Sequence, residues 1–352
     1  MKEECFLTGI VGTGRIGFSL GFDKKREQPA SHTMALFSNK KIKLIAAADS
    51  NLENLKNWQK FSKKHNPQVQ IFSTSEELYK KISGIDIITV AVNEENHLSE
   101  CIKAIECRPH LVILEKPVAL NSSEAEKIQK KASELNVPVM VNHERRFAKD
   151  YLAVQKLIPQ IGEIQNVTAE LDSGLRIYGE KFEKDGTYSL LHDGTHLVNI
   201  ISFLFARQNS SQSPFLKNPL VTGVYKDEKN IVRNFTANYT DVQSKYGMIP
   251  QITLKMSGRS KFFEFRIEIL GTLGKIIIGN GIFDFYLRKE SKLYSGFYSL
   301  TRQKVNLPKK TGYFSGMIQN AVDFLDGTSE LVSPLEDAIL DLKILEEIKK
   351  NF

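Results

Sequence analysis

The chain has 352 residues, 41% of them apolar and 25% charged, with a formal net charge of +7 at pH 7. This composition excludes a disordered protein, and at about 150 residues per domain the length predicts two domains. No apolar run reaches the ~18 residues of a membrane-spanning helix, and no secretory cleavage pattern follows the amino terminus. The three cysteines form no paired motif, which favours a reducing compartment. We therefore expect a cytoplasmic protein with no membrane partner.

The positive charge is spread along the chain. The lysines stand singly or in short runs such as Lys24-Lys25 and Lys63-Lys64, without a basic stripe interleaved with aromatic residues. This distribution argues against a nucleic-acid partner. A general excess of positive charge instead attracts small anionic ligands, such as a nucleotide cofactor or a sugar nucleotide.

Apolar strands and helical segments alternate over the first ~145 residues, which predicts a doubly wound parallel sheet. We place this first domain at residues 1–145. The expected strands are 5–12, 41–49, 70–75, 85–92, 110–117 and 137–143. The expected helices are 16–22, a second piece at 31–38 that Ser31 caps, 50–65, 75–82, 95–106 and 121–136.

From residue 164 onward, apolar and polar residues alternate with period two, which predicts a large, mostly antiparallel open sheet with one solvated face. A helix at about 191–206 and two helices within 316–350 should cover its other face. Residues 146–352 then form an α+β domain for substrate binding and oligomerisation, with the last helices able to pack back on the first domain. We expect substrate specificity in its strands and in the segments 175–186 and 207–214. The expected strands are 164–174, 235–242, 251–258, 262–271, 275–281 and 283–289.

A glycine-rich motif follows the first expected strand. Gly12-Thr13-Gly14-Arg15-Ile16-Gly17 is a G-x-G-x-x-G at the start of a predicted helix. In such a motif the first glycine makes a tight turn, the second lets the backbone approach a pyrophosphate, and the third lets helix and strand pack closely. The phosphates then face free N–H groups at a helix amino terminus. The context predicts a dinucleotide site.

Asp49 ends the second expected strand. A carboxylate at this place accepts hydrogen bonds from the ribose hydroxyls and repels a 2′-phosphate, which favours NAD over NADP. Its distance from the glycines, ~30 residues rather than ~20, is explained by the break in the helix around Pro29. Asp49 is also in position to cap the next helix, and the two roles are compatible.

Glu115-Lys116-Pro117 comes directly after the largely apolar residues 110–114 and closes the strand expected at 110–117. Ligands of doubly wound sheets bind at the carboxyl ends of the strands, so this charged pair is expected to be more than a surface ion pair. Lys116 is placed to donate a hydrogen bond to a substrate hydroxyl and to stabilise its alkoxide as hydride leaves.

Residues 190–199, LLHDGTHLVN, contain His192 and His196 with Asp193 between them. On a continuous helix His196 shares a face with both of the others. Three interpretations are open: a proton-transfer site, a metal site of the H-x₃-H type without other supporting ligands, or a helix start with a structural role.

Several motifs occur in a characteristic order: GTGRIG, AAAD, AVNEENH, EKPVAL, NHERRF, LLHDGTHLVN and IEILGTLGKIIIGNG. Together they resemble the Gfo/Idh/MocA family of NAD(P)-dependent sugar and polyol oxidoreductases over nearly the whole chain. The resemblance implies a Rossmann-type first domain and a catalytic Lys116. It also implies cofactor contacts from the glycine loop, Asp49, Ala91, Val92, Asn93, His97, Glu115 and Arg145, although Val92-Asn93 replaces the threonine-proline usual in the family.

The resemblance makes His196 the general acid/base. In the family an aspartate lies four residues before this histidine, whereas here His192 occupies that position and the aspartate is Asp193. Whether His192 or Asp193 orients His196 stays open.

We therefore expect an NAD(H)-dependent dehydrogenase acting on the CH–OH group of a sugar, sugar nucleotide or cyclitol, assembled as a homodimer or homotetramer through the second sheet. No metal is expected. The rival interpretations are a non-catalytic NAD-binding sensor on the same fold and an imine- or biliverdin-type reductase.

Overall fold

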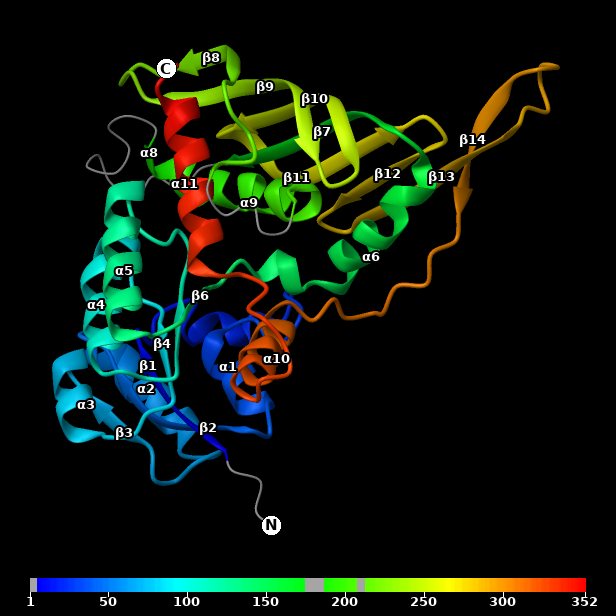
Figure 1. The fold of residues 1–352 in the computed structure, drawn as a ribbon. Helices are drawn as coiled ribbons and strands as arrows, with labels where there is room; N and C mark the ends of the chain where they lie inside the picture. Colours follow the sequence, from blue (N-terminus) through cyan, green and yellow to red (C-terminus); the bar gives the residue numbers. More distant parts are fainter. Residues whose placement is uncertain (1–4, 175–186, 208–212) are drawn as a thin grey trace. The chain divides into compact units, whose positions relative to one another are not determined.

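The structure, a computed structural model, describes residues 5–174, 187–207 and 213–352 (Figure 1). The segment 175–186 and most of 207–214, to which the sequence assigned part of the substrate specificity, lie outside the described residues. The chain divides into two compact units, each built from two separate stretches. Unit 1 comprises Met1–Ala148 and Lys310–Ile339, and unit 2 comprises Lys149–Lys309 and Leu340–Phe352.

Unit 1 contains a six-stranded sheet in the order β3-β2-β1-β4-β5-β6, and all five strand pairs are parallel. The strand order reverses between β1 and β4, and such a switch point is where doubly wound sheets bind ligands. The predicted parallel sheet is thus confirmed. Its strands are β1 (Phe6–Val11), β2 (Ile42–Ala48), β3 (Gln70–Phe72), β4 (Ile87–Val90), β5 (Leu111–Leu114) and β6 (Val139–Val141).

Helices surround this sheet in unit 1. Their bounds are α1 (His32–Ser38), α2 (Leu52–Ser62), α3 (Ser75–Lys81), α4 (His97–Glu106), α5 (Ser122–Leu135) and α10 (Tyr313–Leu325), with short 3₁₀ helices η1 (Ser19–Phe22), η2 (Glu94–Asn96) and η3 (Glu144–Phe147). Apolar residues of α10 join the core formed by β1, β2, α1 and α2, where Trp58 is fully buried. This packing explains why a distant stretch of sequence belongs to unit 1.

The segment after the glycine loop differs from the prediction. Instead of a helix over 16–22, the chain makes turns and the short 3₁₀ helix η1. Gly17 and Gly21 disfavour a regular helix, and a Cβ at Gly21 would lie 2.4 Å from Met34. The second helical piece does form as α1, and the Ser31 side chain caps it by accepting a hydrogen bond from the Met34 backbone.

The outer edge of β6 is covered by a segment from the end of unit 1. Val141 N donates to Ser333 O at 2.9 Å, and Met140 forms a β-bridge with Pro334. An uncovered strand edge exposes unpaired backbone groups, so this segment closes the sheet along its β6 edge.

Unit 2 contains an eight-stranded sheet in the order β14-β13-β12-β11-β7-β10-β9-β8. The β7–β10 pair is parallel and the other pairs are antiparallel, which confirms the predicted mostly antiparallel sheet. Its strands are β7 (Ile164–Gly174), β8 (Leu220–Lys226), β9 (Val232–Ser244), β10 (Gly247–Ser257), β11 (Arg259–Gly271), β12 (Gly274–Gly279), β13 (Ile282–Glu290) and β14 (Tyr298–Gln303).

Helices cover one face of this sheet. They are α6 (Lys149–Leu157), the 3₁₀ helix η4 (Ile158–Ile161), α8 (Thr187–His192), α9 (Gly194–Phe205) and the later part of α11 (Leu335–Lys349), within which the unit boundary falls. The single helix predicted at about 191–206 is therefore two helices. A Cβ at Gly194 would lie 3.0 Å from Leu345, so the break occurs where α9 begins its close packing.

Within the described ranges, no helix has both the length and the apolar character needed to cross a membrane.

Candidate active site

Several predicted site residues of unit 1, together with Asn142, lie along one edge of its sheet. Gly12 directly follows β1, Asp49 follows β2, Ala91 follows β4, Glu115 follows β5 and Asn142 follows β6. Because all these strands are parallel, their carboxyl ends meet at the same edge. The topology alone therefore brings together groups that are up to 130 residues apart in sequence.

The three glycines of the loop have different surroundings. Gly12 has a φ of +94°, and a Cβ there would lie 2.3 Å from Ala91 O; a Cβ at Gly17 would lie 2.1 Å from Gly12 O. A Cβ at Gly14 would meet only the Asn54 side chain, at 3.9 Å. The protein's own packing thus requires glycine at 12 and 17 but not at 14. The open space at Gly14 leaves room for the close approach of a ligand such as a pyrophosphate, so the loop fits a dinucleotide.

Asp49 is tied to the glycine loop. Its Oδ2 accepts hydrogen bonds from the Thr13 backbone N at 2.6 Å and from Thr13 Oγ1 at 2.8 Å. Its Oδ1 accepts from the Asn51 backbone at 2.8 Å. The cap of α2 is therefore Asn51 and not Asp49. Each carboxylate oxygen can accept two hydrogen bonds, and Oδ1 has room for a second donor. The bonds described therefore fix Asp49 and still allow it to bind a ribose hydroxyl. Of the other loop residues, Arg15 is exposed and Ile16 is half-buried.

The residues after β4 differ in how far they are exposed to solvent. Ala91 is buried and donates its N–H to Val11 O, Val92 is half-buried, and Asn93 is exposed. His97, only 1% exposed, lies beneath these residues at the start of α4. Its Nδ1 is 2.6 Å from Pro117 O and its Nε2 is 3.1 Å from Val92 O. His97 therefore connects two strand-end loops. Burial lowers its pKa below the usual histidine value, against the opposing hydrogen bonds.

Glu115 is buried, with 5% of its surface exposed. Its Oε1 accepts hydrogen bonds from His32 Nε2 at 2.6 Å and from Asn142 Nδ2 at 2.5 Å, and its Oε2 is 3.3 Å from the Lys116 backbone N. Burial by itself raises the pKa of Glu115, but the hydrogen bond and charge of His32, the hydrogen bond from Asn142 and the charge of Lys116 hold the net pKa below its usual value. The carboxylate is thus kept ionised inside the protein. Lys116 itself is half-buried.

The sequence interpretation missed His32, Asn142 and His143. Asn142 and His143 follow β6 and were detectable by the rule that strand ends carry function. His32 does not follow a strand. Because the segment before α1 is irregular, the sequence does not indicate that His32 contacts Glu115 at the end of β5.

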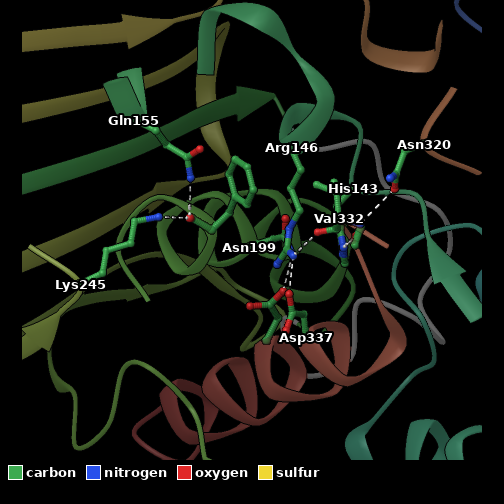
Figure 2. Close-up of polar contacts among 11 residues, drawn as sticks. His143, Arg146, Gln155, Asn199, Lys245, Asn320, Val332 and Asp337 are labelled. Carbon is green, nitrogen blue, oxygen red and sulfur yellow. Dashed lines mark hydrogen bonds and ion pairs between the residues drawn. The ribbon is translucent and has the colours of Figure 1, made fainter. Parts of the chain in front are cut away.

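A second cluster of polar contacts holds the chain after β6 (Figure 2). His143 Nδ1 is 3.0 Å from Ser333 Oγ, and Arg146 bonds Val332 O at 3.0 Å and the Asp337 carboxylate. Burial first, and then the charges of Arg146 and Lys116, lower the pKa of His143 well below its usual value. Arg145, which the resemblance placed near the ligand, is partly exposed and pairs with Glu144 at 3.2 Å.

In unit 2 the break between α8 and α9 rearranges the His192–His196 stretch. Asp193 lies at the break, and its Oδ2 accepts a hydrogen bond from Ser173 of β7 at 3.1 Å. His196 is in the first turn of α9, and both histidines are half-buried. Behind them, Asn199 donates to Asp341 at 2.5 Å and anchors α9 to the later part of α11 (Figure 2). His192 ends α8 and His196 lies in the first turn of α9, and Asp193 between them keeps right-handed helical backbone angles.

Among the described residues, no three His, Cys, Asp or Glu side chains gather in a way that could hold a metal ion. The structure groups the predicted dinucleotide residues with Lys116 in unit 1, and the candidate acid/base residues in unit 2.

Comparison with known proteins agrees with the fold. The chain is 27% identical over 145 residues to scyllo-inositol 2-dehydrogenase (NADP(+)) IolW of Bacillus subtilis, covering 40% of each chain. It is 28% identical over 200 residues to a trans-1,2-dihydrobenzene-1,2-diol dehydrogenase of Xenopus laevis, covering 56% of each. These matches span about half the length of the relatives.

Among solved structures, the WlbA dehydrogenase of Bordetella pertussis, in complex with NADH and UDP-GlcNAcA, superposes with a TM-score of 0.71 at 17% identity. The superposition covers 100% of this chain and 98% of that one, so the fold extends over both units.

Residues 6–143 match the model of the Gfo/Idh/MocA family, described as an oxidoreductase family with an NAD-binding Rossmann fold. This match covers the whole parallel sheet and every strand-end residue described above for unit 1. The amino-terminal part of the chain, residues 6–143, is therefore that of the Gfo/Idh/MocA oxidoreductase family with its NAD-binding Rossmann fold.

Proposed function

We propose that this protein is an NAD(H)-dependent oxidoreductase that interconverts the alcohol and carbonyl forms of a sugar, sugar nucleotide or cyclitol. The observation that carries the proposal is the position of Lys116. It follows β5 on the same sheet edge as the glycine loop, next to a carboxylate that the protein keeps buried and ionised. A cation at this strand end supplies what alcohol–carbonyl chemistry needs, because it stabilises the negative charge that develops on the substrate oxygen.

The roles of the residues follow from their chemistry. The ammonium group of Lys116 donates a hydrogen bond to the substrate oxygen and stabilises the negative charge that develops on it. His196 takes the hydroxyl proton during oxidation and returns it during reduction, which suits an imidazole at neutral pH. Asp193 or His192 orients that imidazole. When bound, the nicotinamide accepts or supplies the hydride.

The cofactor assignment rests on Asp49. A carboxylate at the end of β2 accepts hydrogen bonds from ribose hydroxyls and repels a 2′-phosphate, so we assign NAD rather than NADP. The Bacillus relative is named for NADP(+), and the Bordetella structure contains NADH. A direct measurement on this chain is therefore informative. The proposal requires NADH to bind more tightly than NADPH. It also requires that replacement of Asp49 by serine reduce the difference between these two affinities.

The substrate class comes from the relatives, which are named for inositol and diol dehydrogenation, and from the sugar nucleotide in the Bordetella complex. For the assembly we propose a homodimer or homotetramer through the unit 2 sheet. Phe262 and Phe263 of β11 are 59% and 56% exposed, so this part of the sheet has apolar side chains that a partner subunit would cover. Light scattering at micromolar concentration tests this, and a monomer contradicts it. We place the protein in the cytoplasm.

The decisive experiment is a turnover screen. Purified protein is incubated with NAD⁺ and a panel of sugars, cyclitols and sugar nucleotides, and NADH formation is followed by absorbance. We expect turnover with at least one class, lost in Lys116→Met and retained in Lys43→Met, which removes an exposed lysine of β2. Tight NADH binding without turnover on any of the panel would instead favour a non-catalytic sensor.

A further inference from the structure

Two buried histidines contact the tripeptide that carries Lys116, one on each side. His32, at the start of α1, contacts the Glu115 side chain before the lysine, and His97, at the start of α4, contacts the Pro117 carbonyl after it. The two helices are separate in sequence, and both histidines are at most 1% exposed. Their ring nitrogens therefore serve the protein and not the solvent.

The His32 contact has a defined direction. His32 Nδ1 is buried with no hydrogen-bond partner among the described residues, so a proton on that nitrogen would be unsatisfied. We therefore assign the ring proton that faces Glu115 to Nε2, which donates to Glu115 Oε1 at 2.6 Å. Phe314 of α10 packs edge-on against the ring, with 5.3 Å between the ring centroids, and fixes its orientation.

The bond from His32 reaches Lys116 in two steps. Glu115 Oε1 is held by His32 and by Asn142, and Glu115 Oε2 lies 3.3 Å from the Lys116 backbone N. The carboxylate thus fixes the peptide from which the lysine side chain starts. A charged acceptor with three donors around it has a much narrower range of positions than an unpaired side chain.

His97 acts on the other side. Its Nδ1 makes the shorter contact, 2.6 Å to Pro117 O, and its Nε2 lies 3.1 Å from Val92 O in the loop after β4. A neutral ring has one proton to donate, and burial opposes the second. We assign that proton to Nδ1 and hence to the bond that fixes the peptide after Lys116.

We infer that His32 and His97 are positioning residues for the reaction: they hold the Glu115–Pro117 backbone so that the Lys116 ammonium meets the substrate oxygen. The inference rests on the proposed function of Lys116. Displacement of a catalytic group by about 1 Å costs about 100-fold in rate, so loss of either contact lowers kcat while nucleotide binding persists.

The test uses the two amides that imitate the two ring nitrogens. Glutamine places its amide near the position of Nε2, and asparagine near that of Nδ1. At position 32 the required atom is Nε2, so His32→Gln should keep kcat within about 3-fold and His32→Asn should lower it about 100-fold. At position 97 the required atom is Nδ1, so the order reverses: His97→Asn is the milder change and His97→Gln the severe one.

A second readout does not depend on turnover. Hydrogen exchange of the Lys116 and Val118 amides should accelerate in His32→Asn and His97→Gln, and stay near wild type in the milder pair. Asn142→Ala removes the other donor to Glu115 and should act in the same direction if His32→Asn does not fold. Trp58→Phe is the matched control, because it removes a buried hydrogen bond to Thr33 of α1 without contacting the tripeptide.

The outcomes separate the two proposals. If hydrogen exchange in the variants follows the expected order but the wild-type protein turns over no substrate, the positioning role is supported and the proposed function is overturned. The positioning role is overturned if wild type is active and the order of Asn and Gln is the same at both positions. It is also overturned if kcat follows the melting temperature alone, with Trp58→Phe included.

Discussion

The histidines of unit 1 and those of unit 2 are held in different ways. His32 and His97 are almost fully buried, and each has a ring nitrogen within 2.6 Å of a fixed protein oxygen. His192 and His196 are half-buried beside a break between two helices. A buried imidazole with a fixed partner suits a mechanical role, whereas a partly exposed one is accessible to a substrate proton.

The same contrast applies to the carboxylates. Glu115 of unit 1 is surrounded by two side-chain donors and a backbone N–H, whereas the Asp193 carboxylate of unit 2 accepts a hydrogen bond from the Ser173 hydroxyl. We interpret unit 1 as the buried scaffold of the proposed cofactor site and Lys116, and unit 2 as carrying the more accessible proposed acid/base. The following experiments test that division, beginning with the largest expected effect.

His196→Asn should lower kcat about 1000-fold, or about 4 kcal/mol, because the general acid/base is lost. NADH affinity should stay near wild type, since the glycine loop is in the other unit. Steady-state kinetics and fluorescence titration measure both. His110→Asn, at an exposed surface histidine, is the control. A larger loss in His192→Asn than in His196→Asn would exchange the two roles.

Glu115→Ala should destabilise unit 1 by about 3 kcal/mol, because it leaves the buried donors of His32 and Asn142 without their acceptor. Urea unfolding followed by circular dichroism gives the change in free energy of unfolding. Glu106→Ala removes a half-exposed carboxylate paired with Lys131, and its effect should stay within about 0.5 kcal/mol. Equal effects of the two substitutions would show that the Glu115 contacts contribute little to stability.

Gly12→Ala and Gly14→Ala should differ in kind. At Gly12 the new Cβ would lie 2.3 Å from Ala91 O at a positive φ, so we expect a loss of about 2 kcal/mol in the free energy of unfolding. At Gly14 the space is open apart from Asn54, so the variant should unfold like wild type and bind NADH more weakly. Gly14→Ala with unchanged NADH affinity would contradict the ligand-based explanation of that glycine.

Stability should also depend on pH through the buried histidines. Burial lowers the pKa of His97 and, more strongly, of His143. As the pH falls, these histidines are protonated in the unfolded chain before they are protonated in the folded protein. The stabilisation that they give the folded protein is therefore complete above about pH 6.5, and it declines as the pH falls toward the folded-state pKa. Each group adds at most about 1.4 kcal/mol per pH unit. Between pH 7.5 and 5.5, the free energy of urea unfolding should change less with pH in His143→Gln than in the wild-type protein. An equal change in both proteins would contradict a lowered pKa of His143.

The amino-acid sequence by itself determined the parallel sheet, the mostly antiparallel sheet and the residues at the strand ends. The reason is local: strand periodicity, glycines at a turn and charged residues after apolar runs depend on neighbours in sequence. Gly12, Asp49, Glu115 and Lys116 were found in this way.

Only the tertiary structure revealed the partners of those residues. His32 bonds Glu115 across 83 residues, and His97 bonds Pro117 across 20, and no periodicity encodes such pairs. The turn at Asp193 is likewise seen only in the structure, where Ser173 of β7 donates to the Asp193 carboxylate and Gly194 lies close to Leu345. Sequence patterns locate chemical groups along the chain, whereas the burial and hydrogen bonds that fix their roles arise from residues that the fold brings together.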